Sequence, residues 1–327
     1  MNPTLVAGQS DTPGPVSTDS MPGVVGVPWA SLRREPAPDA ELVDECHLGY
    51  RVHLLEQEGD WWRIETSYGY PGWVSASQIV VEPELVTAWT EPLCWVTGAH
   101  ADIQPVPSVH PTALLTAVRG GLLQMTGEVD GRWSGVRLPD DRAGWIRTGL
   151  ITRRPSPVSH PSPELRERIV AAATEYLGVQ YRWGGKGPDG IDCSGLAWMS
   201  YARNGLSVYR DAELRPPLRP ILPAAAEPGD LLYFPGHVAI SLGAGRIIHS
   251  SDRADGVRFA SLNPNDPDYD ADLADQVIGV GTAFDTPGRP ESRAEMNDAP
   301  GGKASGGPKP DRTHGGATRE PPPTAPA

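Results

Sequence analysis

Hydrophobic and polar residues alternate in short runs between residues 23 and 153, and no long helical period occurs there. Residues 50–55 and 62–65 are two such runs, and Gly and Pro residues separate them from their neighbours. Alternation with a period of two is typical of strands that bury one face. This part of the chain is therefore predicted to form short strands joined by tight turns.

A weak internal repeat divides this region into two parts. Trp62 and Trp73 are 11 positions apart, and Trp133 and Trp145 are 12 positions apart in a similar Gly-Trp context. This spacing fits one hairpin in each repeat. We predict two small all-β barrels, with a single β sandwich as the alternative.

The pattern changes after residue 153. Residues 154–163 contain four prolines and are predicted to be a linker. Ser162 is a good N-cap, and from there hydrophobic residues recur at helical spacing up to Gly178, so a helix is predicted to open an α+β domain. The predicted order is two β modules, a linker and a third domain: 23–82, 83–153, 154–163 and 164–285.

The two ends of the chain differ from the rest in composition. Residues 1–22 are polar and rich in Ser, Thr, Gly and Pro, and residues 286–327 contain no aromatic residue and no Val, Leu or Ile. Segments of this kind cannot bury enough apolar surface to offset the loss of chain entropy. Both are predicted to be disordered.

Charge and cysteine content narrow the classes of function. The chain carries 28 basic and 41 acidic residues, a formal net charge of −13, which argues against nucleic acid or an anionic membrane as the main partner. The apolar runs are too short to span a bilayer. Three cysteines, no CxxC pair and no recognisable signal peptide favour a cytoplasmic location, with secretion by another route left open.

One cysteine lies in a sequence context suited to catalysis. Cys193 follows a glycine-rich segment that begins at Tyr181 and precedes a helix predicted over residues 196–204. The dipole of a helix favours the thiolate form of a cysteine at its N-terminus. Because a lone cysteine is more often a small buried hydrophobic residue, the assignment depends on histidines downstream.

Two histidines, His237 and His249, flank the glycine-rich turn of a predicted β hairpin. A two-residue loop at Gly243-Ala244 would place their rings on opposite faces of the sheet, whereas a three-residue loop with a bulge would place them on the same face. We predict the three-residue loop. Cys193 is then the candidate nucleophile, His237 the general base and His249 the residue that orients it.

A zinc site is the competing use of cysteine and histidine. The sequence has no HExxH or CxxC pattern, and Cys46 and Cys94 are far from Cys193 along the chain. No metal and no other cofactor is predicted.

Several separated motifs carry a family resemblance: Tyr181-Arg-Trp-Gly-Gly185, Asp192-Cys-Ser-Gly195, Pro228-Gly-Asp-Leu-Leu-Tyr-Phe234, His237-Val-Ala-Ile240 and Ile248-His249. They closely resemble the NlpC/p60 cell-wall peptidases, whose catalytic core is papain-like, over about residues 165–284. The two β modules look like the bacterial SH3-like modules that precede such domains. The combination is most similar to the γ-D-glutamyl-L-diamino acid endopeptidases (dipeptidyl-peptidase VI), which recycle cell-wall stem peptides.

The resemblance implies the same catalytic trio and a substrate with a free N-terminal L-Ala before γ-D-Glu. It further implies five residues that contact the substrate: Tyr70, Tyr181, Asp192, Ser194 and Asp211. Asp211, in the pair Arg210-Asp211, is expected to face the substrate ammonium, and Tyr70 to close the cleft from the first module. Glu35 is a further candidate carboxylate, and core packing is the alternative role for Tyr70.

Two rival functions stay open at this point. One is a lytic endopeptidase that acts on intact wall with the β modules as anchors, and the other is a non-enzymatic wall-binding protein. The expected partners are peptides derived from peptidoglycan. The sequence leaves the choice between diaminopimelate and lysine, and the oligomeric state, undecided.

Overall fold

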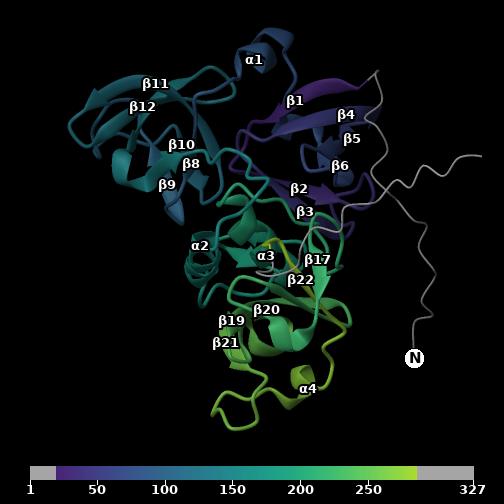
Figure 1. Cartoon of the computed structure of the whole chain (residues 1–327). Helices are drawn as coiled ribbons and strands as arrows, with labels where there is room; N and C mark the ends of the chain where they lie inside the picture. The colour runs from purple at the N-terminus through teal and green to yellow at the C-terminus, as the bar shows by residue number, and fades with distance from the viewer. Residues whose placement is uncertain (1–19, 286–327) are drawn as a thin grey trace, which may run out of the picture. The chain divides into compact units, whose positions relative to one another are not determined.

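The computed structural model describes residues 20–285 (Figure 1). Of the two segments predicted to be disordered, residues 1–19 and 286–327 lie outside the described residues. Met21 and Pro22 belong to the first strand, so ordered structure begins before residue 23. Within residues 20–285, no helix has the length and apolar character needed to cross a membrane.

The first module, residues 20–82, is a seven-stranded antiparallel sheet with the strand order β3-β2-β6-β5-β4-β1-β7. Trp62 on β5 and Trp73 on β6 lie in the hairpin predicted from their spacing. The elements are β1 (Met21–Val25), β2 (Trp29–Arg33), β3 (Leu42–His47), β4 (Arg51–Glu58), β5 (Trp61–Thr66), β6 (Pro71–Ser75), the short 3₁₀ helix η1 (Ala76–Gln78) and β7 (Ile79–Val80).

The second module, residues 83–153, opens with a short helix and contains a five-stranded sheet of order β13-β12-β11-β8-β14 beside a separate β9-β10 pair. Trp133 lies on β12 and Trp145 on β13, and these two strands pair in one hairpin, as the repeat predicts. The elements are α1 (Pro83–Ala88), β8 (Leu93–Val96), β9 (His100–Ile103), β10 (Leu115–Val118), β11 (Leu122–Asp130), β12 (Trp133–Arg137), β13 (Ala143–Arg147), η2 (Thr148–Leu150) and β14 (Ile151–Arg153).

The C-terminal domain, residues 164–285, combines two main helices with a six-stranded antiparallel sheet of order β17-β22-β18-β19-β20-β21. Its elements are α2 (Glu164–Thr174), β15 (Lys186–Gly187), β16 (Gly190–Ile191), α3 (Cys193–Ala202), β17 (Arg219–Ile221), η3 (Pro223–Ala225), β18 (Leu231–Phe234), β19 (His237–Gly243), β20 (Arg246–Ser251), η4 (Asp252–Ala254), β21 (Gly256–Ser261), α4 (Ala271–Ala274) and β22 (Gly279–Thr282). The predicted α+β composition of this domain is therefore present.

Helix α2 is shorter than its hydrophobic pattern predicts. It ends at Thr174, and the amides of Tyr176 and Leu177 bond to carbonyls three residues back, which is the tighter geometry of a closing turn. Leu177 is 40% exposed, so it does not belong to the buried face formed by the hydrophobic residues of the helix. Gly178 then takes a positive φ of 77°, which ends the turn.

One hydrophobic core joins the first module to the C-terminal domain. It includes Ile64 of β5, Ile169 of α2, Trp198 of α3 and Val238 of β19. Both main helices pack on one face of the six-stranded sheet, and α3 also contacts the first module (Figure 1). A separate core fills the second module, and another covers the other face of the six-stranded sheet. Burial of this kind is the main stabilising term of the fold.

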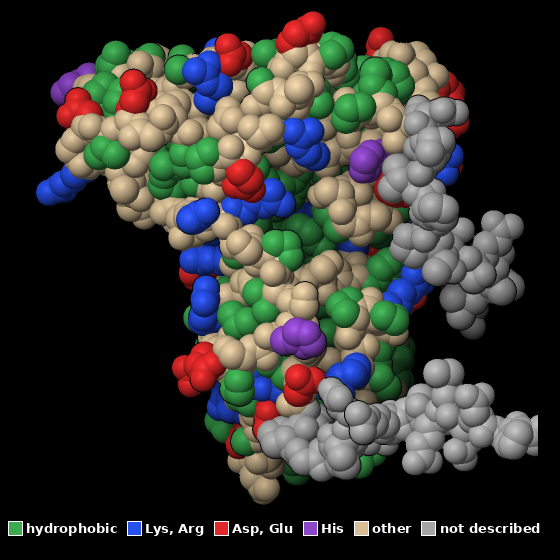
Figure 2. Space-filling view, turned by 45° about the horizontal axis from the view of Figure 1, so that its top comes forward, with side chains coloured by type: hydrophobic (Ala, Val, Ile, Leu, Met, Phe, Trp, Pro, Cys, Tyr) green, Lys and Arg blue, Asp and Glu red, His purple; other side chains and the backbone are tan. Residues whose placement is uncertain are grey.

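On the surface, basic and acidic side chains are interspersed over the face shown in Figure 2. Several charged side chains of the surface form exposed pairs, such as Arg34 with Glu41 and Arg253 with Asp272. Exposed pairs contribute little to stability because water and salt screen them. Buried charged groups have a larger effect on this structure than the exposed pairs.

His47 at the end of β3 is fully buried, and neither ring nitrogen has a hydrogen-bond partner within the described residues. Burial lowers the pKa of His47 to about 3. The folded chain therefore keeps His47 neutral at pH values where an unfolded chain would bind a proton. The contribution of His47 to the free energy of unfolding is fully present above pH ~6.5 and is lost as the pH falls below that value.

We expect the free energy of unfolding, measured with urea between about pH 6.5 and 4, to fall with pH less steeply in His47→Phe than in the wild type. The difference should approach about 1.4 kcal/mol per pH unit, because one proton uptake is removed. The matched control is His110→Phe at an exposed position. Parallel curves for His47→Phe and the wild type would contradict the assignment.

Candidate active site

Cys193 is the first residue of α3, so the helix begins earlier than the predicted residue 196. Asp192 has an extended backbone (φ −89°, ψ 179°), and its carboxylate accepts the amide N–H of Gly195 at 2.5 Å. This is an N-cap, in which a side-chain oxygen satisfies a free amide of the first turn. The cap places Cys193 at the N-terminus of the helix, and the sequence predicts that it lies at or near this end.

A close approach of the first module explains one glycine of the loop before Cys193. Gly184 has a positive φ of 71°, and a Cβ on it would lie 2.6 Å from the carbonyl oxygen of Leu42 on β3. No other residue would avoid both the strain and the clash. The loop that leads to Cys193 is therefore packed directly against strand β3.

The hairpin of β19 and β20 resolves the question of register. Gly243 pairs with Arg246, so the loop has only two residues, Ala244 and Gly245, both with positive φ. The predicted three-residue loop is wrong. The extra residue is instead Leu242, a bulge in β19 between the pairs Ser241–Ile247 and Gly243–Arg246.

This bulge has the effect on the histidines that the longer loop was expected to have. Beyond it Ile240 pairs with Ile248, so the continuing register sets His249 opposite Ala239, on the same face as His237. The two rings meet there, with Nε2 of His237 3.0 Å from Nδ1 of His249. Without the bulge the ladder would place the two histidines on opposite faces.

Helix α3 packs against β19, which brings Cys193 close to the start of this strand. The Cys193 sulfur lies beside the backbone N–H groups of Ser194 and of Val238, the residue after His237. The structure therefore brings the two histidines together and places Cys193 beside the backbone of Val238, next to His237 in the chain. The catalytic roles of these three residues stay predictions.

Burial dominates the protonation of the three groups. It raises the pKa of the Cys193 thiol to about 12, with the Asp192 charge acting in the same direction. Burial also lowers the pKa of both His237 and His249 to about 4. The expected thiolate is therefore not the resting form: near neutral pH the site holds a thiol and two neutral imidazoles.

A pocket of about 320 Å³ opens beside the two histidines. Tyr181, the exposed Trp183, Asp252 and Asp270 are among the residues that line it. Burial raises the pKa of Tyr181, so its hydroxyl stays protonated and can donate a hydrogen bond. The predicted site residue Tyr181 thus lines a cavity that reaches the histidines.

Tyr70 and Asp211 come together from different parts of the chain. The Tyr70 hydroxyl, on the turn before β6, donates a hydrogen bond of 2.9 Å to Oδ1 of Asp211. Burial raises the pKa of Asp211, whereas this hydrogen bond and the charge of Arg210 lower it. The alternative of simple core packing for Tyr70 does not account for this contact.

Asp192 and Ser194 are buried beside Cys193, with 6% and 7% of their surface exposed. Ser194 Oγ donates to Asp192 Oδ1 at 3.0 Å, and both side chains accept hydrogen bonds from Arg210. Their side chains hold the start of α3, and direct contact with a substrate stays a prediction. Glu35 is exposed, whereas Glu41 of the same hairpin accepts the indole N–H of Trp183 at 3.0 Å.

Three residues at this junction have roles that the sequence did not suggest: Asp44, Glu45 and Lys186. All are buried, and they join β3 of the first module to the loop before Cys193. The only signal in the sequence is the acidic pair Asp44-Glu45 inside an otherwise apolar strand. The sequence alone does not show which distant cation such a pair will contact.

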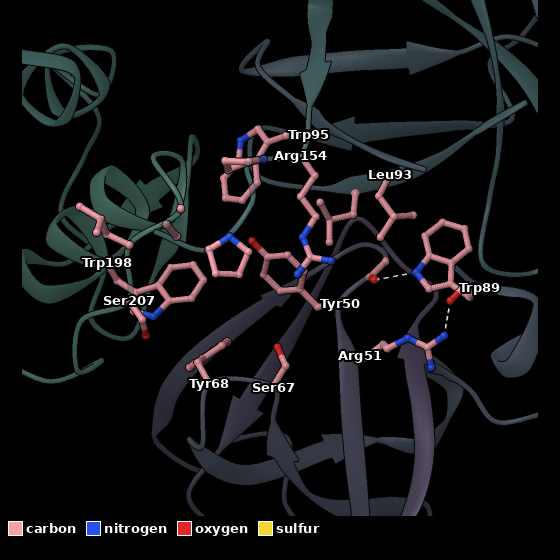
Figure 3. Close-up of a pocket in the computed structure, with 17 residues that line it drawn as sticks. Tyr50, Arg51, Ser67, Tyr68, Trp89, Leu93, Trp95, Arg154, Trp198 and Ser207 are labelled. Atoms are coloured by element: carbon pink, nitrogen blue, oxygen red, sulfur yellow. Dashed lines mark hydrogen bonds between the residues drawn. The ribbon is translucent and has the colours of Figure 1, made fainter. Parts of the chain in front are cut away.

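A second pocket, of about 330 Å³, is lined by residues of the first module, the second module and α3 (Figure 3). Tyr50, Tyr68, Trp95 and Trp198 are among the aromatic residues that line it, and none of the predicted site residues does. Tyr68 and Trp198 also flank the Nζ of Lys186, at 4.4 and 4.3 Å from their ring centroids. The first module and α3 therefore share an aromatic layer next to the buried charges.

Comparison with known proteins agrees with this architecture. The NlpC/P60 family profile matches residues 178–270, and the profile of the bacterial dipeptidyl-peptidase SH3 domain matches residues 32–79. The second module is not part of either match, and its SH3-like character stays a prediction. A solved NlpC/P60 family protein from Bacillus cereus superposes with a TM-score of 0.68 at 22% identity, over 81% of this chain and all of that one.

Two relatives match most of the chain. Dipeptidyl-peptidase 6 of Lysinibacillus sphaericus is 33% identical over 271 residues, which are 81% of this chain and 100% of the relative. A γ-D-glutamyl-L-lysine dipeptidyl-peptidase of Bacillus cereus is 26% identical over 242 residues, 68% of this chain and 71% of the relative. The chain therefore belongs to the NlpC/P60 family and is a cysteine peptidase with an N-terminal SH3-like domain.

Proposed function

We propose that the chain hydrolyses the γ-D-glutamyl-L-diamino acid bond of cell-wall stem peptides that begin with a free L-Ala. The observation that carries the proposal is the Tyr70–Asp211 hydrogen bond, which holds a partly buried carboxylate at the junction of the first module and the C-terminal domain. The names of two relatives, both dipeptidyl-peptidases, support it. Release of a dipeptide requires a site that binds the free N-terminus at a fixed distance from the bond that is cleaved.

Asp211 is the proposed partner of the substrate ammonium. A carboxylate in this position gains a charged hydrogen bond when a free amine enters. If the amine is acetylated or attached to glycan, the carboxylate loses water without gaining a partner, a penalty of about 1–3 kcal/mol. Discrimination against blocked peptides follows from this unpaired charge.

Cys193 is the proposed nucleophile and His237 the general base. Nε2 of His237 faces His249, which leaves Nδ1 to take the thiol proton as the sulfur bonds to the γ-carbonyl carbon of D-Glu. The free amides at the start of α3 stabilise the oxyanion. The proton then passes to the leaving amine, the C–N bond breaks, and water activated by His237 hydrolyses the thioester.

The pocket beside the histidines is proposed to hold the diamino acid that leaves. His237 borders this pocket, and the base that protonates a leaving amine must lie on the leaving-group side. Asp252 and Asp270 lie close enough to His237 to favour its protonated form. Their charges suit a side chain that ends in an amine.

The two β modules are proposed to be SH3-like barrels that wall the cleft of a papain-like core rather than free anchors. We place the enzyme in the cytoplasm, where soluble stem peptides are recycled. The three cysteines are all free thiols, which is compatible with a reducing location.

We expect purified enzyme to cleave L-Ala-γ-D-Glu-diamino acid, with lysine or diaminopimelate in the third position, and to discriminate against the N-acetylated peptide. Tyr70→Phe and Asp211→Asn should each lower kcat/KM for the free peptide by about 5- to 150-fold, the range that corresponds to losing one partner of a charged pair. Cys193→Ala should be inactive. Equal cleavage of free and acetylated peptides, or preference for intact sacculi, would contradict the proposal.

The protonation states give a second expectation. Because the pKa of His237 is about 4, this base stays neutral well below pH 7. We expect kcat/KM to decline only at acid pH, where His237 and the Asp211 carboxylate, whose pKa is raised by burial, take up protons. Because the pKa of Cys193 is about 12, its alkylation by iodoacetamide in the free enzyme should keep rising from about pH 7 to about pH 10. An alkylation rate that levels off below neutral pH would show a resting thiolate instead.

A further inference from the structure

Asp44 on β3 is a charged residue of the first module that is completely buried against the C-terminal domain. Its Oδ1 accepts the Nε–H of Arg210, and its Oδ2 accepts Nζ of Lys186 at 3.1 Å and the hydroxyl of Tyr68. Buried carboxylates are tolerated only when paired and hydrogen-bonded in this way. Each of the two cations comes from the C-terminal domain.

Arg210 connects Asp44 to Asp192 and Ser194 at the start of α3. Its Nη1 donates to Asp192 Oδ1 at 3.1 Å and to Ser194 Oγ at 2.8 Å, and its Nη2 donates to Asp192 Oδ2 at 3.1 Å. The guanidinium is a planar, rigid fork, so a carboxylate that fixes Nε also fixes where the other two nitrogens point. Asp44 therefore sets the plane in which Arg210 holds Asp192.

Both ends of the proposed site depend on that plane. Asp192 caps the helix that begins with Cys193, and Asp211 follows Arg210 directly in the chain. A rotation of the guanidinium would move the cap on one side and the carboxylate for the ammonium on the other. Displacements of about 1 Å can cost an enzyme about 100-fold in rate.

We propose that Asp44 is a positioning residue for catalysis: it orients Arg210 and, through it, both the start of α3 and Asp211. This rests on the proposed function for the part that concerns Asp211. Asp44 does not touch the substrate. The first module thus supplies one part of the cleft through Tyr70 and organises the rest of the site through Asp44.

The competing explanation is that Asp44 only holds the first module in place. Glu45 offers the comparison, because it is buried at the same junction but does not contact Arg210. Its Oε2 accepts the backbone N–H of Lys186 at 2.8 Å, and its Oε1 accepts Nη1 of Arg182 at 3.3 Å. A purely structural role predicts the same defects for both acidic residues.

The charge balance determines which variant to use. Burial alone would raise the pKa of Asp44, but Lys186 and Arg210 hold it below its ordinary value, so the group is ionised. Asp44→Asn by itself would leave a buried cation in excess, which is strongly destabilising. The double variant Asp44→Asn/Lys186→Met removes one charge of each sign and keeps the balance.

The experiment compares the wild type, Asp44→Asn/Lys186→Met, Lys186→Met and Glu45→Gln. Thermal unfolding, kcat/KM for free and N-acetylated tripeptide, and the alkylation rate of Cys193 are measured for each. We expect the double variant to unfold cooperatively, to lose about 10- to 100-fold in kcat/KM for the free peptide, and to lose about 10-fold in selectivity over the acetylated one. Its Cys193 should be alkylated faster, because the start of α3 is held less firmly.

Lys186→Met leaves one buried anion in excess and should lower the unfolding temperature, but it keeps the bond between Asp44 and Arg210. Glu45→Gln does not touch that bond. The folded forms of both should therefore keep the wild-type selectivity and alkylation rate within about 3-fold. Equal defects in these controls, or an unaltered double variant, would overturn the proposal. Failure of the charge-balanced double variant to fold would do so as well, since it would show a role in folding instead. If the wild type itself does not prefer the free amine, the proposed function fails, and the alkylation rate still decides whether Asp44 orients the helix.

Discussion

The site depends on one buried guanidinium. Arg210 is 2% exposed and bonds at once to Asp44 of the first module, to both carboxylate oxygens of Asp192 and to the hydroxyl of Ser194. Arginine suits this position because it is always charged and presents its donors in a fixed plane. The helix that carries Cys193, the loop before it and strand β3 therefore cannot shift independently.

The shared core and the buried charges act together at this junction. Apolar side chains of the first module pack against α3, and within that contact the positive charges of Lys186 and Arg210 are balanced by Asp44 and Asp192. The apolar contact supplies most of the stabilisation, since desolvation offsets much of the attraction between buried ions. The ion pairs fix the orientation of the first module relative to the C-terminal domain, because each buried charge has a partner only in one arrangement of the two.

The second arrangement on which the chemistry depends is a bulge. A two-residue turn at Ala244-Gly245 would separate the two histidines if the ladder were regular, and the extra residue Leu242 restores the shared face. The pair is then 3.0 Å apart and largely removed from water, which keeps both rings neutral. A neutral imidazole can accept the thiol proton, so burial favours a base over a resting ion pair.

The sequence by itself determined the order of the modules, the hairpins marked by Trp62 and Trp133, the presence of a helix that begins at or near Cys193 and the identity of the three candidate catalytic residues. These follow from short-range rules of periodicity, capping and turn chemistry, together with motifs that occur in a recognisable order. Only the tertiary structure decided that the odd residue lies in β19, that burial keeps Cys193 a thiol, and that Asp44, Glu45 and Lys186 join the modules. Register, dielectric environment and the pairing of buried charges all depend on residues that are distant in the chain, and no local pattern encodes which of them will meet.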